Sequence, residues 1–176
     1  PPAADDVLCA NGNAITWAAA DVPTLTCARL TTAAEGGTAG GGFTLSGSTA
    51  VAITADIVAG TTACLTSTHT GTGVNAVTVN GNVTGGSATG AYGARNNSTG
   101  VLTITGAVTG GSGSGAYGAY NNTGTLTING NVTGGSAGGA AGAYNTGTGT
   151  ITITGNVTGG SVTNAYGAWN TGTGTI

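Results

Sequence analysis

The chain has 176 residues, of which only 4% are charged, and its formal net charge is −3. Its two cations are both arginines, Arg29 and Arg95, so it has no basic cluster that could attract nucleic acid or anionic lipid. No stretch approaches the roughly 18 consecutive apolar residues that a transmembrane helix requires. We therefore expect neither a nucleic-acid partner nor insertion into a membrane.

The first segment, residues 1–24, differs from the rest of the chain. It contains Trp17 and three of the five acidic residues, Asp5, Asp6 and Asp21, and it lacks the repeat that fills the later part of the sequence. Because the end of a stack of β-strands must hide its open edge, we interpret residues 1–24 as an N-terminal cap. The sequence contains no Met, so we also expect a processed or trimmed N-terminus.

Residues 25–76 carry a degenerate form of the same repeat. The apolar pair of Val51-Ala52-Ile53 lies 26 residues before the first regular copy, which starts at Val77. Leu25 lies a further 26 residues back and is a candidate start for another copy, with Cys27 in an inward position. We therefore expect degenerate coils over residues 25–76.

Residues 77–176 repeat a unit of 24 or 25 residues, with full copies at 77–101, 102–125, 126–150 and 151–175 and a partial copy from Ile176. Each copy opens with two aliphatic residues that flank a Thr, and a Val-Thr-Gly-Gly segment follows. Alternation of this kind places aliphatic and hydroxyl side chains on opposite faces of a strand. Self-similarity at a fixed period of this size predicts a solenoid, in which each copy forms one coil.

The predicted fold class is therefore all-β, a parallel β-helix (β-solenoid) with about three short strands in each 24–25-residue coil. Glycine pairs such as Gly110-Gly111 separate the strands and allow the chain to turn. The 37 glycines also raise disorder as an interpretation, but the regular alternation of Val, Ile and Leu disfavours it. Because the sequence stops at the first residue of a new copy, we expect either a longer natural chain or a last coil that is open to another chain.

One side of each coil carries two columns of interest. The first is a column of large side chains: Arg95, Tyr120, Tyr144 and Trp169. A companion column has a gap at its third member: Tyr92, Tyr117, Ala141 and Tyr166. The rings of the first column either bind carbohydrate or staple neighbouring coils, and we prefer the second interpretation.

The corner that follows carries an Asn in every coil: Asn96, Asn121, Asn145 and Asn170. Stacked Asn side chains can hydrogen-bond along such a column and satisfy the backbone of the turns, so we predict a structural ladder.

Outward Thr residues form a further ladder beside the first strand of each copy: Thr103, Thr105, Thr127, Thr152 and Thr154. This ladder resembles the Thr-x-Thr arrays of β-solenoid ice-binding proteins. Asn80 and Asn129 replace the second Thr in alternate copies, which breaks the regular array. Ice binding is therefore an alternative and not the preferred interpretation.

The residue types that catalysis requires are scarce. No acidic residue lies in residues 57–176, so the repeats lack the paired carboxylates of a glycosidase. The single His, His69, has no acidic neighbour in the sequence, and we expect it to be exposed in a turn. The three cysteines, Cys9, Cys27 and Cys64, allow one disulfide and one free thiol, and their spacing matches no metal-binding motif. We predict no catalytic residue, no cofactor and no metal site.

The phrase Leu-Thr-Ile-Thr-Gly-x-Val-Thr-Gly-Gly-Ser, at residues 102–112, resembles the strand repeats of filamentous-haemagglutinin-like adhesins, autotransporter passenger domains and phage β-helical fibres. The resemblance covers about residues 51–176. It implies a right-handed, exported and non-catalytic β-helix at a cell or virion surface. On this basis we expect an extracellular structural or adhesive fibre that contacts further copies of itself, continues into a longer chain, or binds surface glycans.

Overall fold

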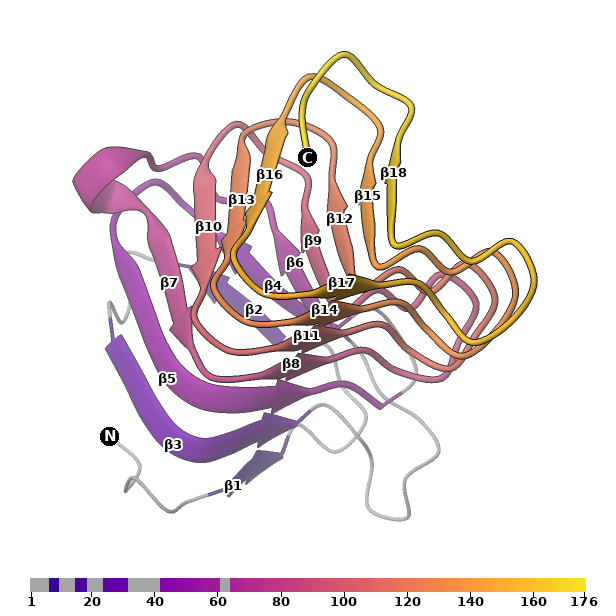
Figure 1. The fold of residues 1–176 in the computed structure, drawn as a ribbon. Helices are drawn as coiled ribbons and strands as arrows, with labels where there is room; N and C mark the ends of the chain where they lie inside the picture. Colours follow the sequence, from indigo (N-terminus) through magenta and orange to yellow (C-terminus); the bar gives the residue numbers. More distant parts are fainter. Residues whose placement is uncertain (1–6, 10–14, 19–23, 32–41, 61–63) are drawn as a thin grey trace.

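The structure is a computed structural model, and it describes residues 7–9, 15–18, 24–31, 42–60 and 64–176. In these residues the chain is all-β: parallel strands stack as a β-solenoid of about five turns, with about 25 residues per turn (Figure 1). The predicted fold class is therefore confirmed. The helix of the described residues is a three-residue 3-10 turn, η1 (Gly73–Asn75), so this part of the chain has no helix of membrane-spanning length.

Each regular coil contributes three short strands. The first side of the solenoid consists of β7 (Val77–Asn80), β10 (Val101–Ile104), β13 (Thr125–Ile128) and β16 (Thr150–Ile153). The second side consists of β8 (Val83–Thr84), β11 (Val108–Thr109), β14 (Val132–Thr133) and β17 (Val157–Thr158). The third side consists of β9 (Ala94–Asn96), β12 (Ala119–Asn121), β15 (Ala143–Asn145) and β18 (Ala168–Asn170).

The earlier part of the chain adds further strands to the same stack. They are β1 (Val7–Cys9), β2 (Ile15–Ala18), β3 (Thr24–Thr31), β4 (Phe43–Ser46), β5 (Val51–Val58) and β6 (Leu65–Ser67). Of these, β3 and β5 are longer than the strands of the regular coils. β5 pairs with both β7 and β8, so it spans the first two sides of the coil, and these two sides form one 11-stranded sheet. The third side continues through β6, β4 and β2 as a 7-stranded sheet.

The pairing register follows the sequence repeat. Leu102 lies opposite Val77 on one side and Leu126 on the other, and Leu126 lies opposite Ile151. These are the first residues of the four copies, so the copy boundaries set the register of the coils. Val51 lies opposite Val77, as the sequence predicts.

The predicted register of the first degenerate coil is wrong. Leu25 lies opposite Ile53 and not opposite Val51, and the pairing of β3 with β5 is also irregular between Thr26 and Arg29. Within the predicted cap, β1 and β2 pair in parallel with β3 and β4, so they extend the two sheets. The rest of residues 1–24, apart from Thr24 at the start of β3, lies outside the described residues.

The core is a thin apolar column inside the coils. Leu102, Ile104 and Val108 from the first two sides and Ala119 from the third are completely buried. On the third side, the position that Ala94 and Ala119 occupy in the regular coils is taken in the degenerate coils by Phe43 and Leu65, which are also completely buried. Burial of aliphatic side chains at about 25 cal/mol per Å² of apolar surface is the main stabilising contribution in such a core.

Candidate functional site

The aromatic column lies on the third side of the solenoid. The pairing of β9, β12, β15 and β18 places Arg95, Tyr120, Tyr144 and Trp169 opposite one another in successive coils. The companion column lies beside it, and the rings of the two columns contact each other. For example, the ring centroid of Tyr92 lies 5.0 Å from that of Tyr120.

These rings stack mainly against each other. Tyr92 and Tyr117 are nearly parallel, with centroids 5.5 Å apart and an interplanar angle of 6°. Tyr144 stacks on Trp169 at 4.6 Å and 14°. The guanidinium carbon of Arg95 lies 5.3 Å from the ring centroid of Tyr120, which is a cation–π contact. A sugar binds to a free ring face, so this geometry favours the interpretation that the columns staple neighbouring coils.

The stack of aromatic rings is continuous through the third regular coil, although the companion column has no ring there. Ala141 is completely buried there, and the ring of Tyr144 lies 4.6 Å from that of Tyr117 in an edge contact. At the far end the rings are more accessible, with Tyr166 50% and Trp169 36% exposed.

The Asn column lies inside the corner that follows. Asn96, Asn121 and Asn145 are completely buried. The Nδ2 of Asn96 donates to the carbonyl oxygen of Gly100 in its own turn, at 3.3 Å, and to that of Thr125 in the next coil, at 3.2 Å. A direct contact between amides joins Asn145 to Asn170, at 3.4 Å. The Asn side chains therefore link neighbouring coils chiefly through hydrogen bonds to backbone carbonyl oxygens.

The prediction that His69 is exposed is wrong, because this side chain is completely buried at the corner of its coil. Its Nε2 donates to the carbonyl oxygen of Thr49 at 2.6 Å, and its Nδ1 accepts the backbone N–H of Gly71 at 3.1 Å. Ser67, two residues earlier, lies opposite Asn96 in the Asn column. His69 therefore closes the corner of a coil that has no Asn, which is a structural role.

A second column of Asx side chains escaped the sequence analysis. At the corner between the first two sides, a side-chain oxygen accepts the backbone N–H at the equivalent position of the next coil. Asp56 accepts from Asn82 at 2.8 Å, Asn82 from Ala107 at 2.9 Å, and Asn131 from Asn156 at 2.9 Å. The recurrence of Asx five residues after the first aliphatic residue could have revealed it.

The predicted Thr ladder lies on the outer face of the first side. Thr103, Thr127 and Thr152 lie opposite one another in successive strands. In the neighbouring column the hydroxyl of Thr154 donates to the carbonyl oxygen of Asn129 at 2.8 Å, and that of Thr105 to Val79 at 3.5 Å. The hydroxyls of Thr105 and Thr154 are hydrogen-bonded to neighbouring coils, and Asn interrupts their column, so we do not propose ice binding.

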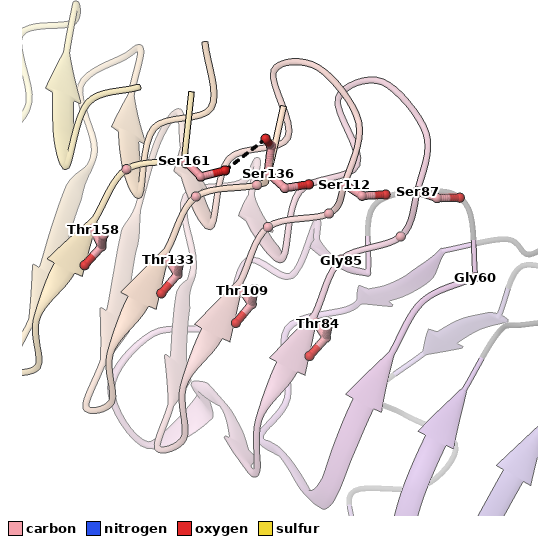
Figure 2. Close-up of a pocket in the computed structure, with 17 residues that line it drawn as sticks. Gly60, Thr84, Gly85, Ser87, Thr109, Ser112, Thr133, Ser136, Thr158 and Ser161 are labelled. Carbon is pink, nitrogen blue, oxygen red and sulfur yellow. Dashed lines mark hydrogen bonds between the residues drawn. The ribbon is translucent and has the colours of Figure 1, made fainter. Parts of the chain in front are cut away.

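The sequence analysis also missed a groove that runs along the second side. It has a volume of about 720 Å³ and is lined by the Thr-Gly-Gly-Ser segment of four successive coils, with Gly60 at one end. Figure 2 shows a row of Thr side chains (Thr84, Thr109, Thr133 and Thr158) and a row of Ser side chains (Ser87, Ser112, Ser136 and Ser161) along it. None of the lining residues is charged.

The structure places one of the three cysteines, Cys64, inside the core. Cys64 is buried and free, so it is not a member of the predicted disulfide. Burial raises the pKa of the Cys64 thiol to about 12. The side chains of Cys9 and Cys27 lie outside the described residues. Among the described residues, no three His, Cys, Asp or Glu side chains are close enough to hold a metal ion.

Comparison with known proteins adds no relative, since no protein-family model, no curated protein and no solved structure matches the chain.

Proposed function

We propose that this chain is a non-catalytic structural or adhesive segment of an extracellular fibre, at a cell or virion surface. The observation that carries the proposal is the register of the regular coils, in which equivalent residues of successive copies lie opposite one another. An outer column such as Thr103, Thr127 and Thr152 therefore offers the same side chain at intervals of about 4.8 Å. Weak contacts repeated along such a rod add to a strong attachment when they form together.

Contacts between ends are part of the proposed function. In the coil that starts at Ile151, Ile153 and Val157 are only partly buried, whereas the equivalent residues of the preceding coils are completely buried. A further coil of the same repeat, from a second copy or from additional chain, would cover these residues and pair with the strand edge. Because the chain carries few charges, electrostatic repulsion opposes such contacts only weakly.

Electron microscopy of the purified chain at several concentrations tests this proposal. We expect filaments that lengthen with concentration. Ile153→Asp places a charge on the partly covered inner face and should abolish them, whereas Thr152→Asp, on the outer face of the same strand, should leave them intact. Circular dichroism checks that both variants keep their β-structure. Discrete short rods at every concentration would exclude end-to-end assembly of this chain.

A second candidate function, carbohydrate binding, is favoured by the groove of the second side. Its floor is glycine backbone and its two rims carry hydroxyls, so it offers apolar contact to sugar C–H groups and hydrogen bonds to their hydroxyls. Its volume falls within the range of about 300–1,000 Å³ that is usual for ligand sites. Because the lining is uncharged and repeats along the rod, it suits a linear, neutral polysaccharide that lies parallel to the axis.

Retention on immobilised neutral polysaccharides tests the second candidate. Thr133→Val removes a groove hydroxyl at nearly constant shape and should weaken retention, and Thr127→Val on the first side is the matched control. Replacing Tyr120, Tyr144 and Trp169 together by Ala tests the aromatic column. Loss of retention in that triple variant alone would assign binding to the column, and equal retention by all variants would exclude both surfaces.

A further inference from the structure

The tyrosines of the third side bring reactive phenols of neighbouring coils together. Tyr92 has two nearly parallel neighbours in the next coil: Tyr117 at 5.5 Å and 6°, and Tyr120 at 5.0 Å and 18°. Tyr144 contacts the same two rings by its edge, at 61° and 77°. Parallel rings can bring their ortho carbons together by a small sliding movement, whereas rings in edge contact must first rotate.

Tyr117 is the better placed of the two parallel partners. The hydroxyl of Tyr120 is hydrogen-bonded to the hydroxyl of Thr146 at 2.9 Å, and its ring lies beside the guanidinium of Arg95. These contacts hold Tyr120 in place. Tyr92 and Tyr117 are both only partly buried, so a small oxidant can reach them. Burial raises the pKa of both phenols, so at neutral pH each loses a proton together with an electron when it is oxidised.

We propose that Tyr92 and Tyr117 form an oxidative cross-linking site, which joins two successive coils as a dityrosine. The oxidant is hydrogen peroxide, acting through a haem peroxidase. Each phenol gives up one electron and one proton, and the two radicals form a carbon–carbon bond between their ortho carbons. The two ortho hydrogens then move to the phenol oxygens and restore both aromatic rings. The two electrons and two protons reduce one hydrogen peroxide to two waters.

The bond would span one full coil, from residue 92 to residue 117. A covalent link of this kind restricts the unfolded chain in the way that a disulfide does, so it would make the rod harder to unfold. This inference is independent of the proposed fibre and carbohydrate functions, since it concerns contacts within one chain.

The positions of the two arginines give a sharp test. Trypsin cuts the unfolded chain only after Arg29 and Arg95, and the second cut separates Tyr92 from the other four tyrosines. The folded chain is treated with peroxidase and hydrogen peroxide, then reduced, unfolded and digested. We expect a product in which fragments 30–95 and 96–176 are joined, with dityrosine fluorescence and a mass two hydrogens below the sum. Any dityrosine between these fragments must contain Tyr92.

Variants identify the partner. Tyr92→Phe should abolish the joined product, Tyr117→Phe should lower it several-fold, and Tyr166→Phe, at the far end of the stack, should leave it unchanged. Absence of the joined product from the folded wild-type chain would overturn the proposal. An equal yield from chain oxidised in denaturant would also overturn it, because the stacked geometry would then be irrelevant. Loss in Tyr120→Phe but not in Tyr117→Phe would show that the assigned partner is wrong.

Discussion

The side-chain Nδ2 of Asn121 donates a hydrogen bond to the carbonyl oxygen of Thr150, which lies 3.2 Å away in the next coil. The same nitrogen donates to the carbonyl oxygen of Gly124 in its own turn, at 3.3 Å. One buried amide therefore closes the corner of one coil and holds the next coil in register. The side chain is completely buried, so removal of the amide leaves a cavity inside the corner.

Asn121→Ala should lower the free energy of unfolding by about 2–4 kcal/mol, because it removes the hydrogen bonds from the buried amide to Gly124 and Thr150 and opens a cavity. Urea denaturation followed by circular dichroism measures the loss. Asn129→Ala, which removes an exposed Asn from the outer face of the first side, is the control and should change stability by less than about 0.5 kcal/mol. Equal effects of the two substitutions would contradict the role of the buried column.

His69→Ala should lower the free energy of unfolding by about 2–4 kcal/mol, because the Gly71 N–H and the Thr49 carbonyl both lose their partner inside the corner. The same denaturation measurement applies. Asn97→Ala replaces an exposed side chain and is the matched control. If the His69→Ala chain is as stable as the control, the buried role of His69 is contradicted and the exposed turn position that the sequence predicted is supported.

Two glycines of neighbouring coils, Gly111 and Gly138, should respond differently to replacement by Ala. A Cβ on Gly111 would lie 1.7 Å from the carbonyl oxygen of Gly86 in the preceding coil, so Gly111→Ala must push two backbones apart. We expect a loss of at least about 2 kcal/mol in the free energy of unfolding. A Cβ on Gly138 would meet no atom within 4 Å, so Gly138→Ala should be neutral or stabilise by up to about 1 kcal/mol. A similar loss in the free energy of unfolding for Gly111→Ala and Gly138→Ala would mean that the coils are not packed this tightly.

Cys64 should react slowly with iodoacetamide in the folded chain. Since burial raises the pKa of its thiol to about 12, only about one molecule in ten thousand carries the reactive thiolate at pH 8. Unfolding returns the thiol to water and to its ordinary pKa, so labelling should become fast in denaturant. Cys64 is the only cysteine between Arg29 and Arg95, so mass spectrometry of tryptic fragment 30–95 reports it alone. Fast labelling of this fragment in the folded chain would contradict the burial.

The sequence by itself determined the solenoid, its coil boundaries and the columns of its regular part. Identical copies stack in register because each presents the same alternation to its neighbour, so Leu102 lies opposite Val77 as the repeat requires. Alternation also decides that Leu102 faces inward and Thr103 outward, since strand side chains point to alternate faces. The Asn column followed from the same repetition, because equivalent residues of equal coils must lie above one another.

Only the tertiary structure decided how the turns and side chains use the space between the strands. The burial of His69 depends on a corner that closes around it, and no alternation of apolar residues encodes that closure. The register of Leu25 follows from the pairing of β3 with β5, whose spacing departs from the one that the sequence repeat predicts. The groove forms because the Thr-Gly-Gly-Ser segments of four coils line one continuous hollow. The stacking of the tyrosines likewise depends on ring orientations, which the packing of neighbouring coils fixes and the positions of the residues in the sequence do not.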